Sequence, residues 1–116
     1  MAWDSKKEML EAFFADDASV RAGHMFGYPA FYIGRSMFAC LFDGQLGLKV
    51  PEVVANEARN LADVTDFRPN GKPKMREWIQ FSVESKADLE NHTELINHAV
   101  EYAHLNTQKK KEESHR

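Results

Sequence analysis

Residues 25–50 form the most apolar stretch of the chain, and glycine-containing turns divide it into short runs. Asp43-Gly44 separates two of these runs, and glycine's tolerance of positive φ suits a tight hairpin there. Met37 to Phe42 is apolar at every position, which is typical of a strand covered on both faces. Gln45 to Val50 alternates between polar and apolar residues, which indicates a half-buried strand. The stretch therefore predicts antiparallel strands at the centre of a sheet.

Amphipathic segments flank this stretch and predict helices. Ser5-x-x-Glu8 and Ser85-x-x-Asp88 have the form of helix N-terminal caps, and Pro51 suits the first turn of a helix. Three helices are expected. The first starts at Ser5, the second runs from Pro51 to about Leu61, and the third runs from Ala87 to about Leu105. Further strands are expected at 64–68 and 75–83. The predicted fold class is α+β, an antiparallel sheet of about five strands with helices mainly on one face.

The length of 116 residues fits one compact domain, which we place at residues 1–108, followed by a charged, flexible tail at 109–116. No apolar run approaches membrane-spanning length, and no signal-peptide core follows the first residues. The single cysteine, Cys40, lies within the apolar stretch and is interpreted as a small buried hydrophobe. A cytoplasmic protein without membrane contact is the resulting expectation.

A basic cluster surrounds the turn-rich segment at 69–73. Positive charges beside an aromatic residue, here Trp78, are the minimal requirement for binding a phosphate or nucleic acid. The net charge of −3 argues against general attraction to nucleic acid, so charges that protect a sheet edge are the favoured interpretation. The members of this candidate basic patch are Arg68, Lys72, Lys74 and Arg76.

A protein-contact surface is the second candidate site. If Ile79, Phe81 and Val83 face the helices, Trp78 and one apolar set of the central strand remain on the other face. An uncovered apolar sheet face is typical of protein interfaces, and a homodimer is one form that such binding takes. The alternative is that a loop containing Tyr28 or Tyr32 covers the face. The candidate contact surface consists of Met37, Ala39, Leu41, Lys49 and Trp78.

Catalytic motifs are missing from the sequence. It holds no nucleotide-binding glycine motif, serine nucleophile elbow or carboxylate pair with catalytic spacing. His92, His98 and His104 are six residues apart, so they do not converge on one helix face as metal ligands. We therefore predict no catalytic residue, no metal and no cofactor. An enzyme or small-molecule binder with a pocket between helix and sheet is the weakest hypothesis.

A string of short motifs resembles the N-terminal domain of TfoX/Sxy competence regulators, to which YjbR/MmcQ-like proteins are related. The motifs are Met25-Phe26-Gly27, Phe31-Tyr32-Ile33-Gly34, Met37-Phe38-Ala39, Asp43-Gly44, Leu46-Gly47-Leu48-Lys49 and Lys74-Met75-Arg76-Glu77-Trp78. The resemblance covers about residues 5–105 and implies a secretion-chaperone-like arrangement in the order α-β(3)-α-β(2)-α. Tyr28-Pro29 departs from the family pattern, which has a second glycine at this point.

The function expected from this resemblance and from the residues together is a non-enzymatic, cytoplasmic interaction or regulatory domain. It would bind protein through the sheet face, and the partner would be another protein or a second copy of the chain. The alternative is a nucleic-acid or phosphate-ligand binder that uses the basic loop at 68–76.

Overall fold

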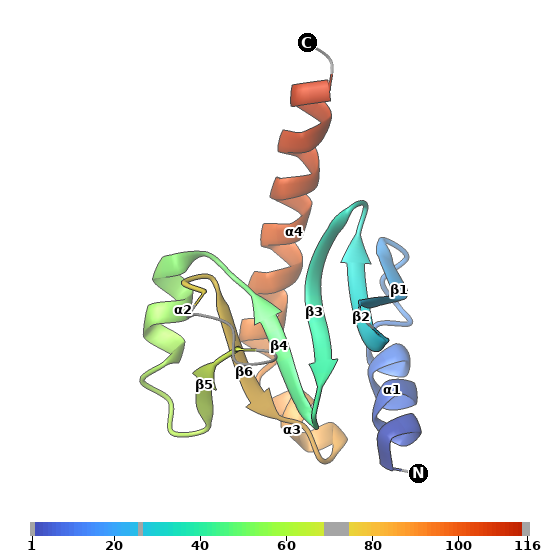
Figure 1. Cartoon of the computed structure of the whole chain (residues 1–116), viewed down its shortest axis with the longest axis vertical. Coiled ribbons are helices and arrows are strands. Elements are labelled where there is room, and N and C mark those ends of the chain that lie inside the picture. Colours follow the sequence, from blue (N-terminus) through green and yellow to red (C-terminus); the bar gives the residue numbers. More distant parts are fainter. Residues whose placement is uncertain (1, 26, 69–74, 115–116) are drawn as a thin grey trace.

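The computed structural model describes residues 2–25, 27–68 and 75–114, with side chains at 6–25, 27–68 and 75–108. Figure 1 shows the arrangement of the elements. In chain order they are α1 (Ala2–Phe13), β1 (Val20–Met25), β2 (Tyr28–Ile33), β3 (Ser36–Phe42), β4 (Gln45–Lys49), α2 (Glu52–Ala58), β5 (Val64–Asp66), β6 (Trp78–Ser82), α3 (Lys86–Asn91) and α4 (Thr93–Ser114). The predicted α+β class is confirmed.

The described strands form one antiparallel sheet in the order β1-β2-β3-β4-β6-β5. Asp43 and Gly44 join β3 to β4 with φ values of 52° and 77°, the positive values that a two-residue hairpin needs. The sheet has one strand more than the expected five, because the segment at 20–25 pairs with β2 along its whole length.

One face of the sheet carries the hydrophobic core. Ala39, Leu48 and Ile79 are successive cross-strand partners, so they point the same way, and all three are fully buried. Each described helix adds side chains to this core, and in Figure 1 the strands β4 and β6 lie in front of α3. The helical contributions are Leu10 and Phe14 from α1 and its end, Ala55 and Ala58 from α2, Leu89 from α3, and Leu95, Ile96, Ala99 and Ala103 from α4.

An irregularity in β3 changes which side chains point to the core. The pairing of β3 with β2 shifts between Phe31↔Ala39 and Tyr32↔Met37, which leaves Phe38 as an extra residue. Phe38 is buried on the helix side, where its ring lies 5.5 Å from that of Phe14. The expectation that Met37, Ala39 and Leu41 form one set on a single face of this strand is therefore wrong for Met37.

The helix boundaries also differ from the predicted ones. α1 begins at Ala2, so Ser5 lies inside the helix and does not cap it. The helix expected from Ala87 to Leu105 is two helices, because the backbone turns at His92 with a φ of −115°. The hydroxyl of Thr93 donates to the carbonyl of Glu90 at 2.8 Å, which satisfies one of the free carbonyls at the end of α3.

The last helix is longer than expected. α4 continues to Ser114, through most of the segment that was predicted to be a flexible tail. None of the described helices is both long enough and apolar enough to cross a bilayer.

Candidate protein-binding surface

The second face of the sheet lies opposite the core and is here called the helix-free face, since the buried residues of the described helices all belong to the core. Cross-strand partners share a face, so the strand registers assign its members. They are Arg21, Gly23 and Met25 from β1; Tyr28, Ala30 and Tyr32 from β2; Met37, Cys40 and Phe42 from β3; Gln45, Gly47 and Lys49 from β4; Thr65 from β5; and Trp78, Gln80 and Ser82 from β6.

The structure divides the predicted contact surface between the two faces. Met37, Lys49 and Trp78 lie on the helix-free face, where each is half-buried. Ala39 and Leu41 are completely buried in the core on the opposite face, so they offer no surface to a partner. The extra residue at Phe38 is the reason, because it puts Met37 on the face opposite to Ala39.

Phe67 covers the centre of the helix-free face. This residue follows β5 and is 1% exposed, with ring-centroid distances of 5.3 Å to Trp78 and 6.4 Å to Phe42. A Cβ atom at Gly47 would lie 2.7 Å from the Phe67 ring, so the ring occupies the space above this glycine. The expected alternative, a loop containing Tyr28 or Tyr32 that covers the face, is wrong, because both tyrosines lie in the strand β2, where the Tyr32 ring lies over Gly23.

Around Phe67 the face presents large side chains that are only half-buried. Met25, Tyr32, Met37 and Trp78 are of this kind, and the guanidinium of Arg21 lies 4.7 Å from the centroid of the Tyr32 ring. Tyrosine, tryptophan, methionine and arginine are the residues enriched at protein interfaces. Methionine adapts its shape to different partners. The composition of this face is therefore that of a contact surface.

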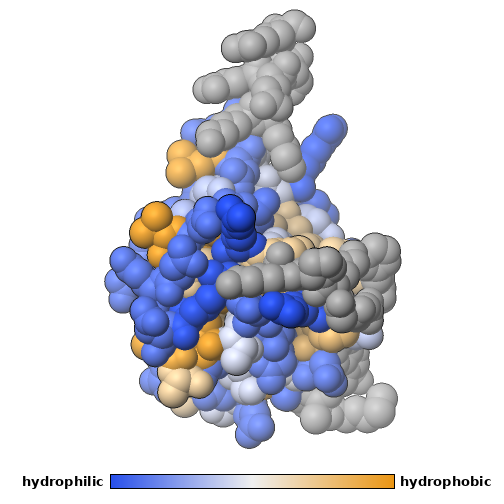
Figure 2. Space-filling view, turned by 60° about the vertical axis from the view of Figure 1, so that its left-hand side comes forward, coloured by the Kyte–Doolittle hydropathy of each residue, from blue (hydrophilic) through white to orange (hydrophobic). Residues whose placement is uncertain are grey.

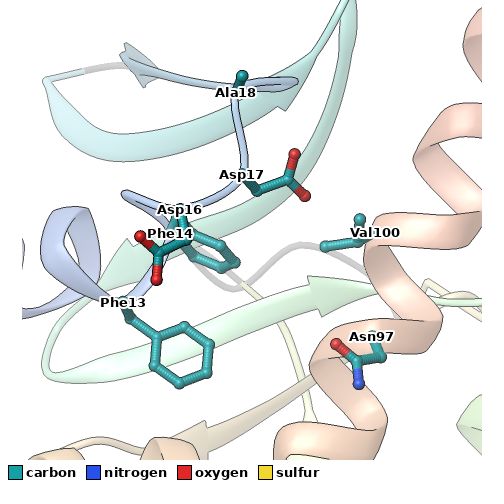
Figure 3. A pocket seen from close by; sticks show the side chains of 7 residues that line it. All are labelled: Phe13, Phe14, Asp16, Asp17, Ala18, Asn97 and Val100. Atoms are coloured by element: carbon teal, nitrogen blue, oxygen red, sulfur yellow. The ribbon is translucent and has the colours of Figure 1, made fainter.

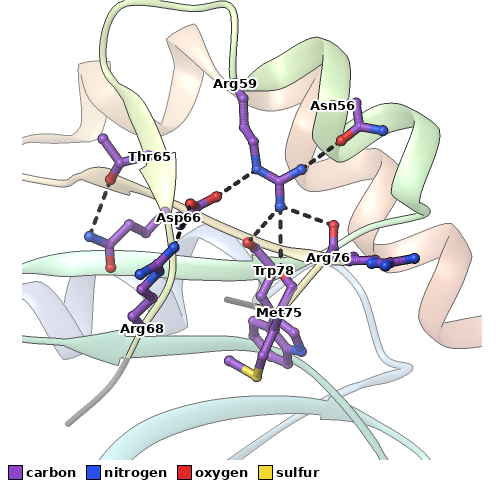
Figure 4. Close-up of polar contacts among 9 residues, drawn as sticks. Asn56, Arg59, Thr65, Asp66, Arg68, Met75, Arg76 and Trp78 are labelled. Carbon is purple, nitrogen blue, oxygen red and sulfur yellow. Dashed lines mark hydrogen bonds and ion pairs between the residues drawn. The ribbon is translucent and has the colours of Figure 1, made fainter. Parts of the chain in front are cut away.

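Arg59 fixes the segments that border Trp78 (Figure 4). From the end of α2 its Nε donates to Asp66 at 2.7 Å and its Nη1 donates to Asn56 at 2.8 Å. Its Nη2 donates to the carbonyl of Arg76 at 3.0 Å and lies 3.5 Å from the carbonyl of Trp78. Five donors in a rigid plane allow one arginine to hold a helix, a strand and a loop together. Arg59 belongs to neither of the candidate sites predicted from the sequence.

The described part of the candidate basic patch is accompanied by carboxylates. Arg68 lies 3.5 Å from Asp66, and Arg76 lies 3.8 Å from Glu52. Lys72 and Lys74 lie outside the described residues. The arginines that the structure places are thus partly neutralised by neighbouring acids.

A small cavity of about 350 Å³ adjoins Trp78 at the border of the helix-free face. Its walls are formed by Lys49, Glu52, Met75, Arg76, Glu77 and Trp78. The hydroxyl of Tyr102 donates a hydrogen bond to the Glu77 carboxylate, which raises the pKa of Tyr102 to about 12. Within the described part of the chain, the Lys49 ammonium has neither an ion pair nor a hydrogen bond.

A second cavity lies on the helix side, between the end of α1, the following loop and α4 (Figure 3). Its volume is about 480 Å³, and Phe13, Asp16, Asp17 and Asn97 are among the residues that line it. Asp17 accepts hydrogen bonds from the backbone N–H and the hydroxyl of Ser19, which lower the pKa of its carboxyl. This cavity lies between two helices, whereas the cavity beside Trp78 is lined by residues of α2, β4 and β6.

His92 and Cys40 are buried and have structural positions. The His92 ring stacks on Phe81 at 3.9 Å, with Nδ1 2.9 Å from the Asp88 carbonyl and Nε2 2.9 Å from Asp63. Cys40 is fully buried, and burial raises the pKa of its thiol to about 11. Over the described residues, no three histidine, cysteine or acidic side chains converge in a way that would hold a metal ion.

Comparison of the chain with known proteins gives one match, and that match is to a family model. No curated protein and no solved structure matches the chain significantly. A family model does match, and it covers residues 12–104, which include every described strand, α2, α3 and parts of α1 and α4. The chain therefore belongs to the TfoX N-terminal domain family, a family of small regulatory-type domains.

Proposed function

We propose that the chain is a non-enzymatic, cytoplasmic regulatory domain that works by binding another protein through the helix-free face. The observation that supports this most strongly is the set of half-buried Met25, Tyr32, Met37 and Trp78 on a sheet face to which the described helices add no buried residue. In this arrangement a partner would remove apolar surface from water without any refolding of the domain. Arg59 and Phe67 support the proposal, because they fix Trp78 in place before binding.

The α2 side of the molecule offers a less continuous apolar surface. Figure 2, which brings the α2 side forward, shows separate hydrophobic patches on a largely hydrophilic surface. Val53 on α2 is 69% exposed and lies outside the helix-free face, so it is a matched control position. The alternative function, nucleic-acid binding by the loop at 68–76, receives little support from Arg68 and Arg76, which lie near carboxylates.

Site-specific photo-crosslinking tests the proposal in the cells that make the protein. A photoreactive amino acid is placed at Gln80 on the helix-free face, or at Val53 as the control. We expect a discrete crosslinked species from position 80 and a much lower yield from position 53. The mass of the species distinguishes a second copy of the chain from a different protein.

Specificity is tested with charge substitutions in the same experiment. Met37→Glu places a charge on the helix-free face and should abolish the species, whereas Val53→Glu should leave it unchanged. Equal yields from positions 80 and 53, or a species that persists in Met37→Glu, would show that the chain does not work through this face.

A further inference from the structure

We propose that the partner presents a carboxylate next to an apolar side chain, and that Lys49 binds this carboxylate in the cavity beside Trp78. The proposal rests on the proposed function and adds the chemistry of the partner: an acidic peptide segment. Protein partners offer this chemistry in any segment that places Asp or Glu beside a large apolar residue.

One charged side chain of the cavity, Lys49, is available to bind an anion. Of the four charged side chains in its walls, Arg76 lies near Glu52, and Glu77 accepts a hydrogen bond from Tyr102. Lys49 has no such partner among the described side chains. Lys49 is half-buried as a residue, and an ammonium without a partner gains from an incoming anion through a charge-assisted hydrogen bond, which is stronger where the nearby protein lowers the dielectric constant.

The apolar part of the site lies directly beside Lys49. Trp78 is its cross-strand partner in β6, and Met75 forms another wall of the cavity. The Trp78 indole packs against the Phe67 ring at an interplanar angle of 32°. The backbone N–H of Trp78 donates to the Met75 carbonyl at 3.1 Å. The site is thus ordered before binding, which reduces the entropy lost on association.

The wider face is complementary to an acidic segment. Among the strand residues assigned to the helix-free face, Arg21 and Lys49 are cationic and none is acidic. This local excess of positive charge stands out on a chain whose formal net charge is −3. Opposite charges across an interface speed association and select the partner.

A carboxylate suits the cavity better than a phosphate does. Glu52 and Glu77 stand in the same walls as Lys49, and they repel a doubly charged phosphate more strongly than a singly charged carboxylate. The arrangement therefore favours an acidic protein segment over a nucleic acid.

Two blocked dipeptides that differ by one charge test the proposal. N-acetyl-Phe-Glu-amide and N-acetyl-Phe-Gln-amide are titrated into the whole protein, and binding is measured from the NMR signal of the Trp78 indole N–H. We expect the Glu peptide to bind about tenfold more tightly, as one charge-assisted hydrogen bond would give. Lys49→Gln should abolish this difference, and Lys86→Gln, which removes an exposed cation at the start of α3, should preserve it.

Several results would overturn the proposal. These are equal binding of the two peptides, a difference that persists in Lys49→Gln, or no shift up to about 10 mM peptide, where weak contacts are measurable. A stronger shift of the same signal by oligo-dT would assign the cavity to nucleic acid. The two experiments can also give different answers. If the Glu and Gln peptides bind equally well but the crosslink from Gln80 forms and Met37→Glu abolishes it, the acidic partner is rejected and the proposed function stands.

Discussion

Arg59 is the residue on which the border of the helix-free face most depends. Its guanidinium bonds to Asp66, to Asn56 and to the backbone next to Trp78, and the Arg59 and Asp66 side chains are only 16% and 25% exposed. Removal of the guanidinium takes the 2.7 Å donor away from the half-buried Asp66, which keeps Arg68 at 3.5 Å. It also takes a donor away from the carbonyls of Arg76 and Trp78. Such losses are costly because the remaining groups stay desolvated.

We predict that Arg59→Met lowers the free energy of unfolding by about 2 kcal/mol or more. Arg76→Met is the matched control, because its side chain is 80% exposed and lies 3.8 Å from Glu52, an exposed pair worth about 0.5 kcal/mol. Chemical denaturation of both variants measures the two effects. Equal, small losses would contradict the role assigned to Arg59.

The stability of the protein also depends on the fit between Gly47 and the Phe67 ring. Gly47→Ala would bring a methyl group within 2.7 Å of the Phe67 ring and displace it, at a cost of about 1–3 kcal/mol. The double variant Gly47→Ala with Phe67→Leu should lose less stability than the sum of the single variants, because the smaller side chain makes room. Strict additivity in denaturation experiments would show that the two residues do not share this space.

Cys40 reports on opening of the sheet. Its thiol is fully buried and its pKa is raised to about 11, so little reactive thiolate exists at pH 8. We predict that Ellman's reagent modifies the native protein far more slowly than the protein in denaturant, with a rate that follows unfolding. Immediate modification of the native protein would mean that the helix-free face admits reagents at its centre.

At the scale of elements, α3 begins with a cap that depends on pH. The Asp88 carboxylate accepts hydrogen bonds from the backbone N–H groups of Glu84, at 2.8 Å, and Ser85, at 3.2 Å, and these bonds lower the pKa of Asp88. A carboxyl whose pKa is lower in the folded state stabilises the protein above its unfolded pKa, and the stabilisation is lost as the pH falls through the folded value.

We therefore predict that Asp88→Asn is less stable than the wild type near neutral pH and that the difference shrinks as the pH falls below about 4, the ordinary aspartate range. Thermal unfolding between neutral and acidic pH measures it. A difference that stays constant over this range would refute the assignment of the cap to the ionised carboxylate.

Much of the element order was predictable because it depends on local patterns. The Asp43-Gly44 hairpin, the half-buried strand at 45–50 and the cap at Asp88 each follow from a few neighbouring residues. The irregularity at Phe38 was not predictable from the sequence. Every residue from Met37 to Phe42 is apolar, so no change in the order of polar and apolar residues marks the extra residue. That single residue decided which predicted contact residues reach the helix-free face.

The candidate site was harder to predict because it depends on contacts between distant segments. Trp78 and Lys49 were predicted from strand alternation, and their pairing is in the structure. Phe67 and Arg59 were missed, because nothing near them in the sequence shows that one covers Gly47 or that the other reaches the backbone beside Trp78. Side chains that complete a surface from another element leave no local pattern.

At the scale of the whole molecule, the sheet separates two different surfaces. One face is closed by helices and forms the core, and among the described residues it is aromatic side chains that cover part of the other. The cations Arg21 and Lys49 lie on the second face, although the chain as a whole is acidic. This separation is the physical basis for placing protein binding on the helix-free face.

The yield of the species crosslinked from Gln80, compared between the wild type and Met37→Glu, tests this placement most directly. We predict a discrete species in the wild type and its loss in Met37→Glu, with Val53→Glu indistinguishable from the wild type. A yield that is the same in all three proteins would contradict the assignment of partner binding to the helix-free face.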